Sequence, residues 1–342
     1  MMTLPAVTFL VVFLAFSNGA NDVSKGVATL LGGGVSHIRR VLLWGMAGNV
    51  AGGLAALHFG GALVQTFGGG FLIPGFVESG GFMISVLLGA SLWVFLSTLK
   101  GWPVSTTHAL IGGILGAAVV SIGTGGFVWR SLWDKAVIPL LASPLVAMGL
   151  AFFFWKGRKW IQKNDGLFAF KTGLLSGPTF LHRLHWISAG ATSFARGLND
   201  VPKMAALLVV AGAGATAGPG AGRAFALSIA LVSLAMGIGG IWKGLRILRV
   251  LSFRVTPLDP STGLIANLST TLPTLLASPL GLPVSTTHVS AGALFGIRIL
   301  SRKSPHEEDA LRSILGAWLV TFPAAAILAA LLATTFKLLK LT

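Results

Sequence analysis

The stretch Phe16-Ser-Asn-Gly-Ala-Asn-Asp-Val-Ser-Lys25 returns in the second half of the chain as Phe194-Ala-Arg-Gly-Leu-Asn-Asp-Val-Pro-Lys203, 178 residues later. A second stretch, Pro103-Val-Ser-Thr-Thr-His108, returns as Pro283-Val-Ser-Thr-Thr-His288, 180 residues later. Two polar motifs that repeat in the same order within apolar sequence indicate a membrane protein with a duplicated fold. Such proteins usually bind their substrate where the two repeats meet.

The composition around these motifs is typical of a membrane protein. Of the 342 residues, 54% are hydrophobic and only 10% are charged. Apolar runs of about 20 residues recur, which is roughly the length that spans a bilayer core. We therefore predict an all-α polytopic membrane protein with ten apolar segments, at about residues 4–32, 41–67, 81–99, 104–123, 136–155, 186–212, 224–243, 263–280, 284–300 and 311–336.

The number of segments predicts how the two halves are related. Five segments per half is an odd number, so the second half enters the membrane upside down. If 81–99 and 104–123 form a re-entrant hairpin, three crossings remain, which is still odd. We prefer hairpins, whose tips place Pro103–His108 and Pro283–His288 inside the membrane, where non-helical backbone is tolerated if it lines a cavity. The predicted organisation is two inverted-topology repeats with broken helices, over residues 1–155 and 186–342, joined by a basic cytoplasmic linker over 156–185.

The basic residues predict the orientation. A net charge of +16 would favour nucleic-acid binding in a soluble protein, but here Lys and Arg lie mainly in loops, which excludes that function. Loops on one side hold 17 Lys and Arg, and loops on the other side hold 5. The positive-inside rule then places the linker in the cytoplasm and both termini outside, in the cell (plasma or inner) membrane. Since the chain has no Cys, disulfides and thiolate metal sites are excluded.

The Asn-Asp motif places acids inside apolar helices. An Asp or Lys at the bilayer centre costs about 2.5–3.5 kcal/mol, so Asp22 and Asp200 indicate a function. Lys25 and Lys203 follow them at i+3 and can lie on the same helical face, as supporting charge. We expect the helices to unwind just before each Asp, at Ser17-Asn-Gly and at Arg196-Gly, with Pro202 strengthening the second break. The alternative is that each Asp–Lys pair only holds helices together.

An unwound helix exposes carbonyl oxygens beside the motif side chains. Together with the carboxylates of Asp22 and Asp200 and the amide oxygens of Asn21 and Asn199, these form an all-oxygen site suited to a hard cation such as sodium. No other metal, and no cofactor beyond a sodium ion or proton as coupling ion, is expected. The sequence contains no transition-metal spacing, nucleotide-binding loop or nucleophile constellation, so we predict that the chain is not an enzyme.

The Pro-Val-Ser-Thr-Thr-His motif is typical of a helix start, because Pro suits the first turn and Ser and Thr are favoured N-caps. Free N–H groups and the positive dipole end then form an anion site, such as one for phosphate. The hydroxyls that can donate to the anion are those of Ser105, Thr106, Thr107, Ser285, Thr286 and Thr287. Plain N-capping is the alternative. His108 and His288 can bond the anion or carry protons in gating, but we favour structural hydrogen bonds across the hairpin.

At these residues the chain resembles the inorganic phosphate transporter (PiT) family. The family pattern is a duplicated Gly-x-Asn-Asp-Val, here Gly19–Val23 and Gly197–Val201, with a duplicated Pro-x-Ser-Thr-Thr-His. The resemblance covers essentially the whole chain. It implies an inverted-repeat secondary transporter that imports orthophosphate with sodium or protons. It also implies that the Ser-Thr-Thr tips cradle phosphate, while Asn21, Asp22, Asn199 and Asp200 contribute to substrate and cation binding.

The chain departs from the family pattern at three places. Arg196 stands where members often have His, Ser24-Lys25 stands where Ala-Asn is common, and Pro202-Lys203 follows the second Val. The extra charge of Arg196 either favours a divalent anion or takes the place of one coupling cation. The identity of the coupling ion therefore stays open, as does the choice between a monomer and a homodimer.

The function we expect is symport of phosphate across the bilayer by alternating access at a midplane site. Moving HPO₄²⁻ inward against 100 mV costs about 4.6 kcal/mol, which two monovalent cations would cancel. The alternative is a symporter of the same fold for sulfate or another tetrahedral oxyanion. A carboxylate that touches the anion favours phosphate, because monohydrogen phosphate has a proton to donate and sulfate has none.

Overall fold

Helices make up almost all of the structure, a computed structural model that describes residues 3–35, 37–73, 79–163, 178–212, 221–253, 257–301 and 308–340. The first half contains α1 (Thr3–Asp22), a 3₁₀ segment (Val23–Val27), α2 (Ala28–Gly32), α3 (Ile38–Phe59), α4 (Gly61–Phe67), α5 (Gly80–Lys100), α6 (Thr106–Ile122), α7 (Trp129–Leu132), a π-helical segment (Trp133–Val137) and α8 (Ile138–Lys163). The second half contains α9 (Pro178–Gly212), α10 (Ala221–Phe253), α11 (Pro260–Ala277), α12 (Thr286–Ser301) and α13 (Glu308–Leu338). Each of the ten predicted segments is helical, so the all-α class is confirmed.

Six of the described helices are long and apolar enough to cross a membrane: Leu4–Gly32, Ile38–Phe59, Gly80–Lys100, Trp129–Trp160, Gly222–Phe253 and Ile314–Leu338. The long helix α9 is not among them, because Arg196, Asp200 and Lys203 lie in its centre. Large apolar side chains are exposed along α8 and α13, including Leu141, Leu145, Phe153, Leu319 and Leu331. Such exposed apolar faces fit contact with lipid, and the chain is a multi-pass membrane protein.

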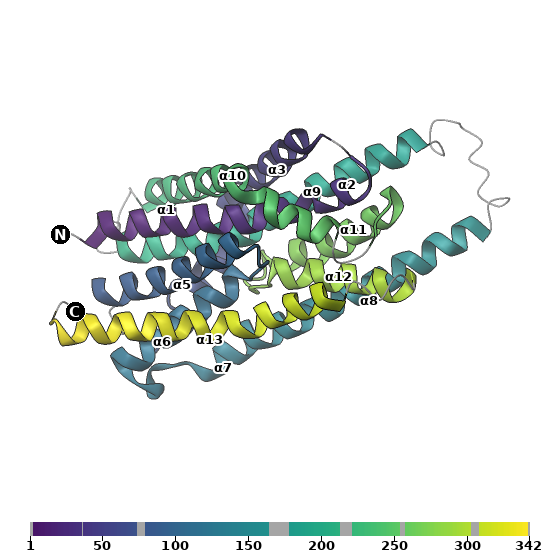
Figure 1. Cartoon of the computed structure of the whole chain (residues 1–342). Coiled ribbons are helices and arrows are strands. Elements are labelled where there is room, and N and C mark those ends of the chain that lie inside the picture. Colours follow the sequence, from purple (N-terminus) through teal and green to yellow (C-terminus); the bar gives the residue numbers. More distant parts are fainter. Residues whose placement is uncertain are drawn as a thin grey trace.

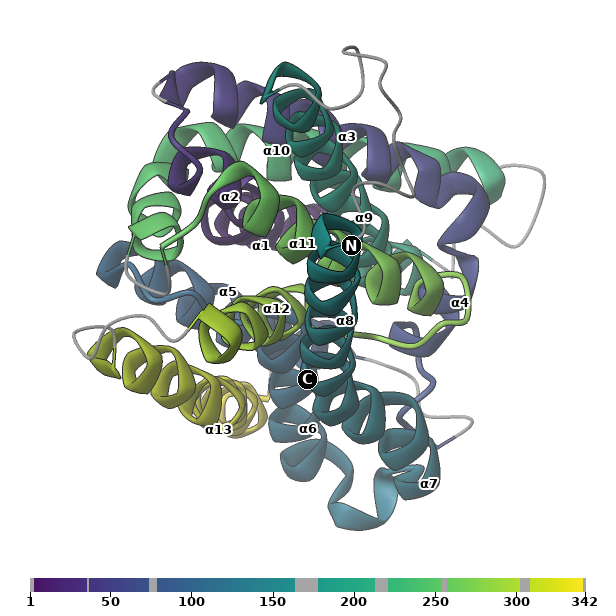
Figure 2. The ribbon, with the colours of Figure 1, turned by 90° about the vertical axis from the view of Figure 1, so that its right-hand side faces the viewer.

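The two halves interlock and do not stack as separate bodies. In Figure 1, α1 begins at the left end and α9 begins at the right end, so these corresponding helices run in opposite directions. α1 packs along α10 and α9 packs along α3, while α6 packs on α13 and α12 on α8. Viewed from the linker end, α3 and α10 lie at one side, α6, α7 and α13 at the opposite side, and the second hairpin between them (Figure 2). Opposed directions are what inverted repeats require; the repeat boundaries stay a prediction.

The helices do not unwind where the sequence predicted. α1 continues through Ser17–Gly19 to Asp22 and changes to 3₁₀ geometry only over Val23–Val27, and α9 continues through Arg196 and Pro202. The glycines serve helix crossing instead. A Cβ on Gly19 would overlap the backbone of Met236 in α10, and one on Gly197 would overlap that of Asn49 in α3. The predicted breaks at these glycines were therefore wrong, because glycine here permits close packing.

Both hairpins are present, and their tips meet near the centre of the bundle (Figure 1). α5 ends at Lys100, and the turn passes through Gly101 with φ +77°; the matching turn after α11 passes through Gly281 with φ +69°. This left-handed conformation favours glycine. The backbone N–H of Trp102 donates to Ser97 at 2.9 Å, and that of Leu282 donates to Ala277 at 3.1 Å. The two turns therefore share one geometry.

Helices α8 and α9 extend into the predicted linker, 156–185, from its two ends. α8 continues to Lys163 and α9 begins at Pro178, so both ends of that stretch are helical. Residues 164–177 lie outside the described residues. α8 ends and α9 begins at the right end of Figure 1, whereas α1 begins and α13 ends at the left end.

Candidate functional site

A cluster of buried charges lies where the hairpin tips meet α1 and α9. It contains the buried Lys and Arg side chains of the described residues, Lys25, Arg196 and Lys203, and the buried acids, Asp22 and Asp200. None of the five is more than 4% exposed. Three cations against two anions leave one net positive formal charge in a buried site. Because an uncompensated buried charge is costly, the cluster favours an anionic ligand.

Asp22 is the acid with the most partners. Its Oδ1 accepts hydrogen bonds from Arg196 at 2.6 Å and forms an ion pair with Lys25 at 3.1 Å. Arg196 comes from α9 in the other half of the chain, so this pair joins the two halves. The same guanidinium donates to the carbonyl of Thr286 at 3.0 Å and to the hydroxyl of Ser290.

Asp200 repeats part of this arrangement. Lys203 donates to its Oδ1 at 2.9 Å, and so does the amide of Asn199 at 2.9 Å. The hydroxyl of Thr286 lies 3.2 Å from Asp200 Oδ2 and 3.3 Å from Asp22 Oδ1. The second hairpin tip therefore lies between the two acids and contacts both.

Each lysine connects both hairpin tips. Lys25 donates to the carbonyl of Val104 at 2.9 Å and to the hydroxyl of Thr287 at 2.6 Å. Lys203 donates to the carbonyl of Val284 at 2.9 Å and to the hydroxyl of Thr107 at 2.7 Å. In both cases one partner belongs to the hairpin of the same half and the other to the hairpin of the opposite half.

The two motif asparagines hold the backbone of the hairpin turns. Asn21 donates to the carbonyl of Trp102 at 2.9 Å and accepts from the N–H of Val104 at 3.1 Å. Asn199 donates to the carbonyl of Val284 at 3.1 Å. These bonds fix the extended residues that precede α6 and α12. The sequence predicted these asparagines at the site but not their contacts with the turns.

The predicted helix starts are confirmed. Ser105 accepts from the backbone N–H of His108 at 3.3 Å, and Ser285 accepts from that of His288 at 3.2 Å. Nδ1 of His108 lies 2.9 Å from the hydroxyl of Ser105, in its own turn and not across the hairpin. The two imidazole rings instead pack together, with centroids 4.4 Å apart. The serines take the capping role, which leaves the hydroxyls of Thr107, Thr286 and Thr287 in contact with the charged side chains.

Sequence reasoning missed two polar contacts at the site. Asn18 accepts a hydrogen bond from the hydroxyl of Thr106 at 2.6 Å. It occupies the position in the first motif that Arg196 occupies in the second, so alignment of the two motifs could have revealed it. Ser290, the partner of Arg196, lies two residues after the second motif ends at His288 and had no signal of its own.

A polar network flanks the cluster between α2, α9, α11 and α12. Asn267 accepts from Thr29 at 3.0 Å and donates to Ser188 at 3.0 Å. A small cavity beside it is lined in part by Lys25, Thr29, Thr192, Asn267, Thr270 and Ser290. In Figure 1, α11 and α12 lie toward the end where α8 ends and α9 begins.

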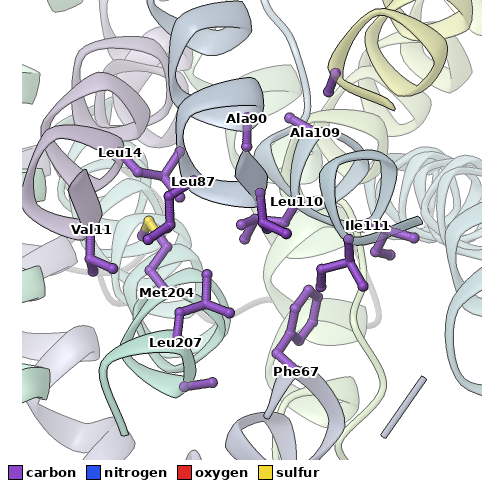
Figure 3. Close-up of a cluster of buried hydrophobic side chains, with 14 of the residues drawn as sticks. Val11, Leu14, Phe67, Leu87, Ala90, Ala109, Leu110, Ile111, Met204 and Leu207 are labelled. Carbon is purple, nitrogen blue, oxygen red and sulfur yellow. The ribbon is translucent and has the colours of Figure 1, made fainter. Parts of the chain in front are cut away.

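The opposite flank is apolar. Leu14, Leu87, Leu110 and Leu207 stand at the offsets of 178 and 180 from Thr192, Asn267, Ser290 and Thr29. They belong to one buried hydrophobic cluster, and Figure 3 shows them gathered with Ala90 and Met204. Equivalent positions of the two halves are thus polar on the linker side and apolar on the side of the termini.

Comparisons with known proteins agree on one family. The model of the phosphate transporter family matches residues 18–329. A "probable low-affinity inorganic phosphate transporter" of Rhizobium meliloti is 30% identical, covering 93% of this chain and 92% of that protein. A relative from Thermococcus kodakarensis, described as a phosphate permease, is 27% identical and covers 98% of this chain and 97% of that protein. A solved structure titled "The sodium-dependent phosphate transporter" matches with a TM-score of 0.86 and 25% identity, covering 99% of this chain and 100% of that chain.

The multi-pass helical bundle and the agreement of the comparisons define a membrane transport protein. The family match covers most of the chain, and the chain belongs to the phosphate transporter family. It is a transport protein for inorganic phosphate and not an enzyme.

Proposed function

We propose that this chain imports phosphate by secondary active symport with sodium or protons, and that phosphate binds between the two hairpin tips. The observation that carries the proposal is the excess positive charge at the point where both tips meet. The ligands are hydroxyls and backbone N–H groups at the starts of α6 and α12, together with the motif amides. The full set is Ser105, Thr106, Thr107, Ser285, Thr286, Thr287, Asn21 and Asn199.

The two acids serve ion coupling in this proposal. Asp22 and Asp200 are both within reach of the hydroxyl of Thr286, so a change in their charge state or ion occupancy is felt at the phosphate ligands. Coupling is required energetically, because the two charges of HPO₄²⁻ cost about 4.6 kcal/mol to move against 100 mV. Arg196 is the charge that links Asp22 to the second tip.

The two flanks of the cluster support alternating access. The apolar flank around Leu14, Leu87 and Leu207 closes the site toward the termini, and the polar flank around Asn267 offers hydrogen bonds toward the linker. The proposed orientation places the termini outside and the linker in the cytoplasm of a cell membrane. Phosphate therefore leaves the site along the polar flank, and the outside opens when the apolar cluster separates.

Sulfate is the competing substrate. A carboxylate in contact with the anion accepts the proton of monohydrogen phosphate, whereas sulfate leaves the carboxylate unpaired at a cost of about 1–3 kcal/mol. Because Thr286 brings the anion ligands within 3.3 Å of both Asp22 and Asp200, the geometry favours phosphate.

The test is uptake of radiolabelled phosphate into proteoliposomes. Sodium and proton gradients are imposed separately, and unlabelled sulfate is added as a competitor. Uptake that one gradient drives and sulfate leaves unchanged supports the proposal. Phosphate uptake that neither gradient stimulates contradicts symport, and uptake that sulfate blocks reassigns the substrate.

We expect Thr286→Val to raise the apparent KM for phosphate about tenfold, because the substitution keeps the shape and removes a hydroxyl that faces both acids. The matched control is Thr334→Val, which removes an exposed hydroxyl that donates to the carbonyl of Ala330 in its own helix. The dependence of uptake on phosphate concentration in proteoliposomes measures the apparent KM of both variants. An unchanged KM for Thr286→Val would remove this hydroxyl from the substrate site.

We expect Asn267→Leu to lower the maximal uptake rate about tenfold with little change in KM. The substitution places at position 267 the residue found at the equivalent position of the first half, Leu87. A phosphate ion that passes along the polar flank then loses a hydrogen-bonding partner. Rates are compared at equal amounts of reconstituted protein whose melting temperature has been measured. A normal rate for a correctly folded variant would show that phosphate does not pass along this flank.

A further inference from the structure

Lys25 and Lys203 each lie inside a cage of three oxygens of three different kinds. Around Lys25 these are the carboxylate of Asp22 at 3.1 Å, the carbonyl of Val104 at 2.9 Å and the hydroxyl of Thr287 at 2.6 Å. The cage around Lys203 has the same composition, with Asp200 at 2.9 Å, the carbonyl of Val284 at 2.9 Å and the hydroxyl of Thr107 at 2.7 Å.

The chemistry of these cages is that of a site for a hard cation. Carboxylate, carbonyl and hydroxyl oxygens are the ligands such ions prefer, and the Thr and carbonyl oxygens come from opposite hairpin tips. In this chain the central cation is an ammonium group fixed to the helix. Its three protons are matched by three oxygen acceptors, so it keeps no donor for phosphate. Each lysine therefore acts as a fixed cation and not as a direct ligand of the substrate.

We propose that the ammonium groups of Lys25 and Lys203 occupy the positions of two monovalent cations, so that this chain binds phosphate without sodium. The inference rests on the proposed function, which requires cations beside the anion. A fixed ammonium supplies that charge permanently, and it closes the cage to a sodium ion because the same oxygens cannot serve both. A cation bound to the helix does not cross the membrane with phosphate. The proton then remains as the coupling ion.

The position of the lysines strengthens this assignment. Both are at i+3 from their acids, and both ammonium groups join the two hairpin tips. Arg196 adds a third cation without a counterpart in the first motif, where Asn18 is uncharged. The cluster thus carries its positive excess before any ion binds.

The experiment measures equilibrium binding of ³²P-labelled phosphate to the purified full-length chain, in choline chloride buffer and in sodium chloride buffer. We expect the wild-type dissociation constant to be the same in both. The key variant is Lys25→Asn, which removes the ammonium and leaves a short side chain with an amide oxygen. Its affinity in choline should fall by about 30-fold, the lower range for truncation of a buried charge pair. Sodium should restore the affinity by occupying the opened cage.

Lys243→Asn is the matched control, because Lys243 is exposed and lies over the ring of Trp242. It should bind phosphate as the wild type does in both buffers. Sodium binding itself, followed by ²³Na NMR, should be absent in the wild type and appear in Lys25→Asn. A merely structural lysine would produce neither the gain of sodium binding nor the rescue by sodium.

Each other outcome has a definite meaning. Wild-type binding that requires sodium overturns this inference and leaves phosphate transport intact. Wild-type binding in neither buffer overturns the proposed function as well. A loss in Lys25→Asn that sodium does not restore, or no loss at all, shows that the ammonium does not replace a cation. If that variant does not fold, the wild-type comparison between the two buffers decides the question alone.

Discussion

Asp22→Asn is expected to lower phosphate uptake by at least about 100-fold. Asp22 is the only anion in direct contact with Lys25 and Arg196 among the described residues, at 3.1 and 2.6 Å. An amide leaves both buried cations without a counter-charge, and breaking a buried pair costs about 3–5 kcal/mol. Asp200→Asn should have a smaller effect, because Asp200 pairs with a single basic side chain, Lys203. Uptake into proteoliposomes at saturating phosphate measures the transport rate of both variants. The dependence of their residual uptake on sodium and proton gradients reports on ion coupling.

Asp134→Asn is the control for this prediction. Asp134 forms an ion pair with Arg130 at 3.5 Å, but the two side chains are 54% and 93% exposed. Exposed pairs contribute about 0–1 kcal/mol, so this substitution should leave uptake unchanged. Wild-type uptake and ion dependence in both Asp22→Asn and Asp200→Asn would disprove the coupling role of the acids.

Gly19→Ala and Gly197→Ala are each expected to lower the melting temperature by about 2–5 °C. A methyl group on Gly19 would overlap the backbone of Met236, and one on Gly197 would overlap that of Asn49. Backbone cannot move aside as a side chain does, so α1 must separate from α10, and α9 from α3. Overpacking of this kind costs about 1–3 kcal/mol, and each kcal/mol corresponds to about 1.5 °C in a chain of this length, because the unfolding entropy grows with the number of residues.

The control is Gly149→Ala in α8, where an added methyl meets no atom within 4 Å. Alanine is a better helix former than glycine by about 1 kcal/mol, so this variant should melt at the same temperature or slightly higher. Thermal unfolding of purified protein in detergent measures the melting temperatures of all three glycine variants. Equal melting temperatures for Gly19→Ala and Gly149→Ala would show that the crossing of α1 and α10 is not tight.

The architecture could be predicted because it depends on local signals. Segment length and hydropathy located the long helices, and the Pro-Val-Ser-Thr-Thr-His motifs located the helix starts that Ser105 and Ser285 cap. The predicted breaks failed because a glycine beside polar residues has the same sequence pattern whether it unwinds a helix or lets another helix approach. Only the position of α10 and α3 distinguishes the two cases.

The site residues were identified by their repetition, but their partners were not. The pairing of Arg196 with Asp22 depends on how the halves interlock, and no local pattern contains that information. The contrast between the two flanks was present in the sequence, because Leu87 and Asn267 are equivalent positions of the two halves. They are separated by 180 residues, as are the two Pro-Val-Ser-Thr-Thr-His motifs. The contrast becomes interpretable only when the structure places both beside the cluster.

The central claim is that phosphate binds between the two hairpin tips, beside Asp22 and Asp200. The most direct measurement is the anomalous scattering of arsenate, a tetrahedral analogue of phosphate, in crystals of the full chain. The account predicts one arsenic peak within hydrogen-bonding distance of the hydroxyls of Thr106, Thr107, Thr286 and Thr287. A peak elsewhere, with this cluster empty at saturating arsenate, would contradict it.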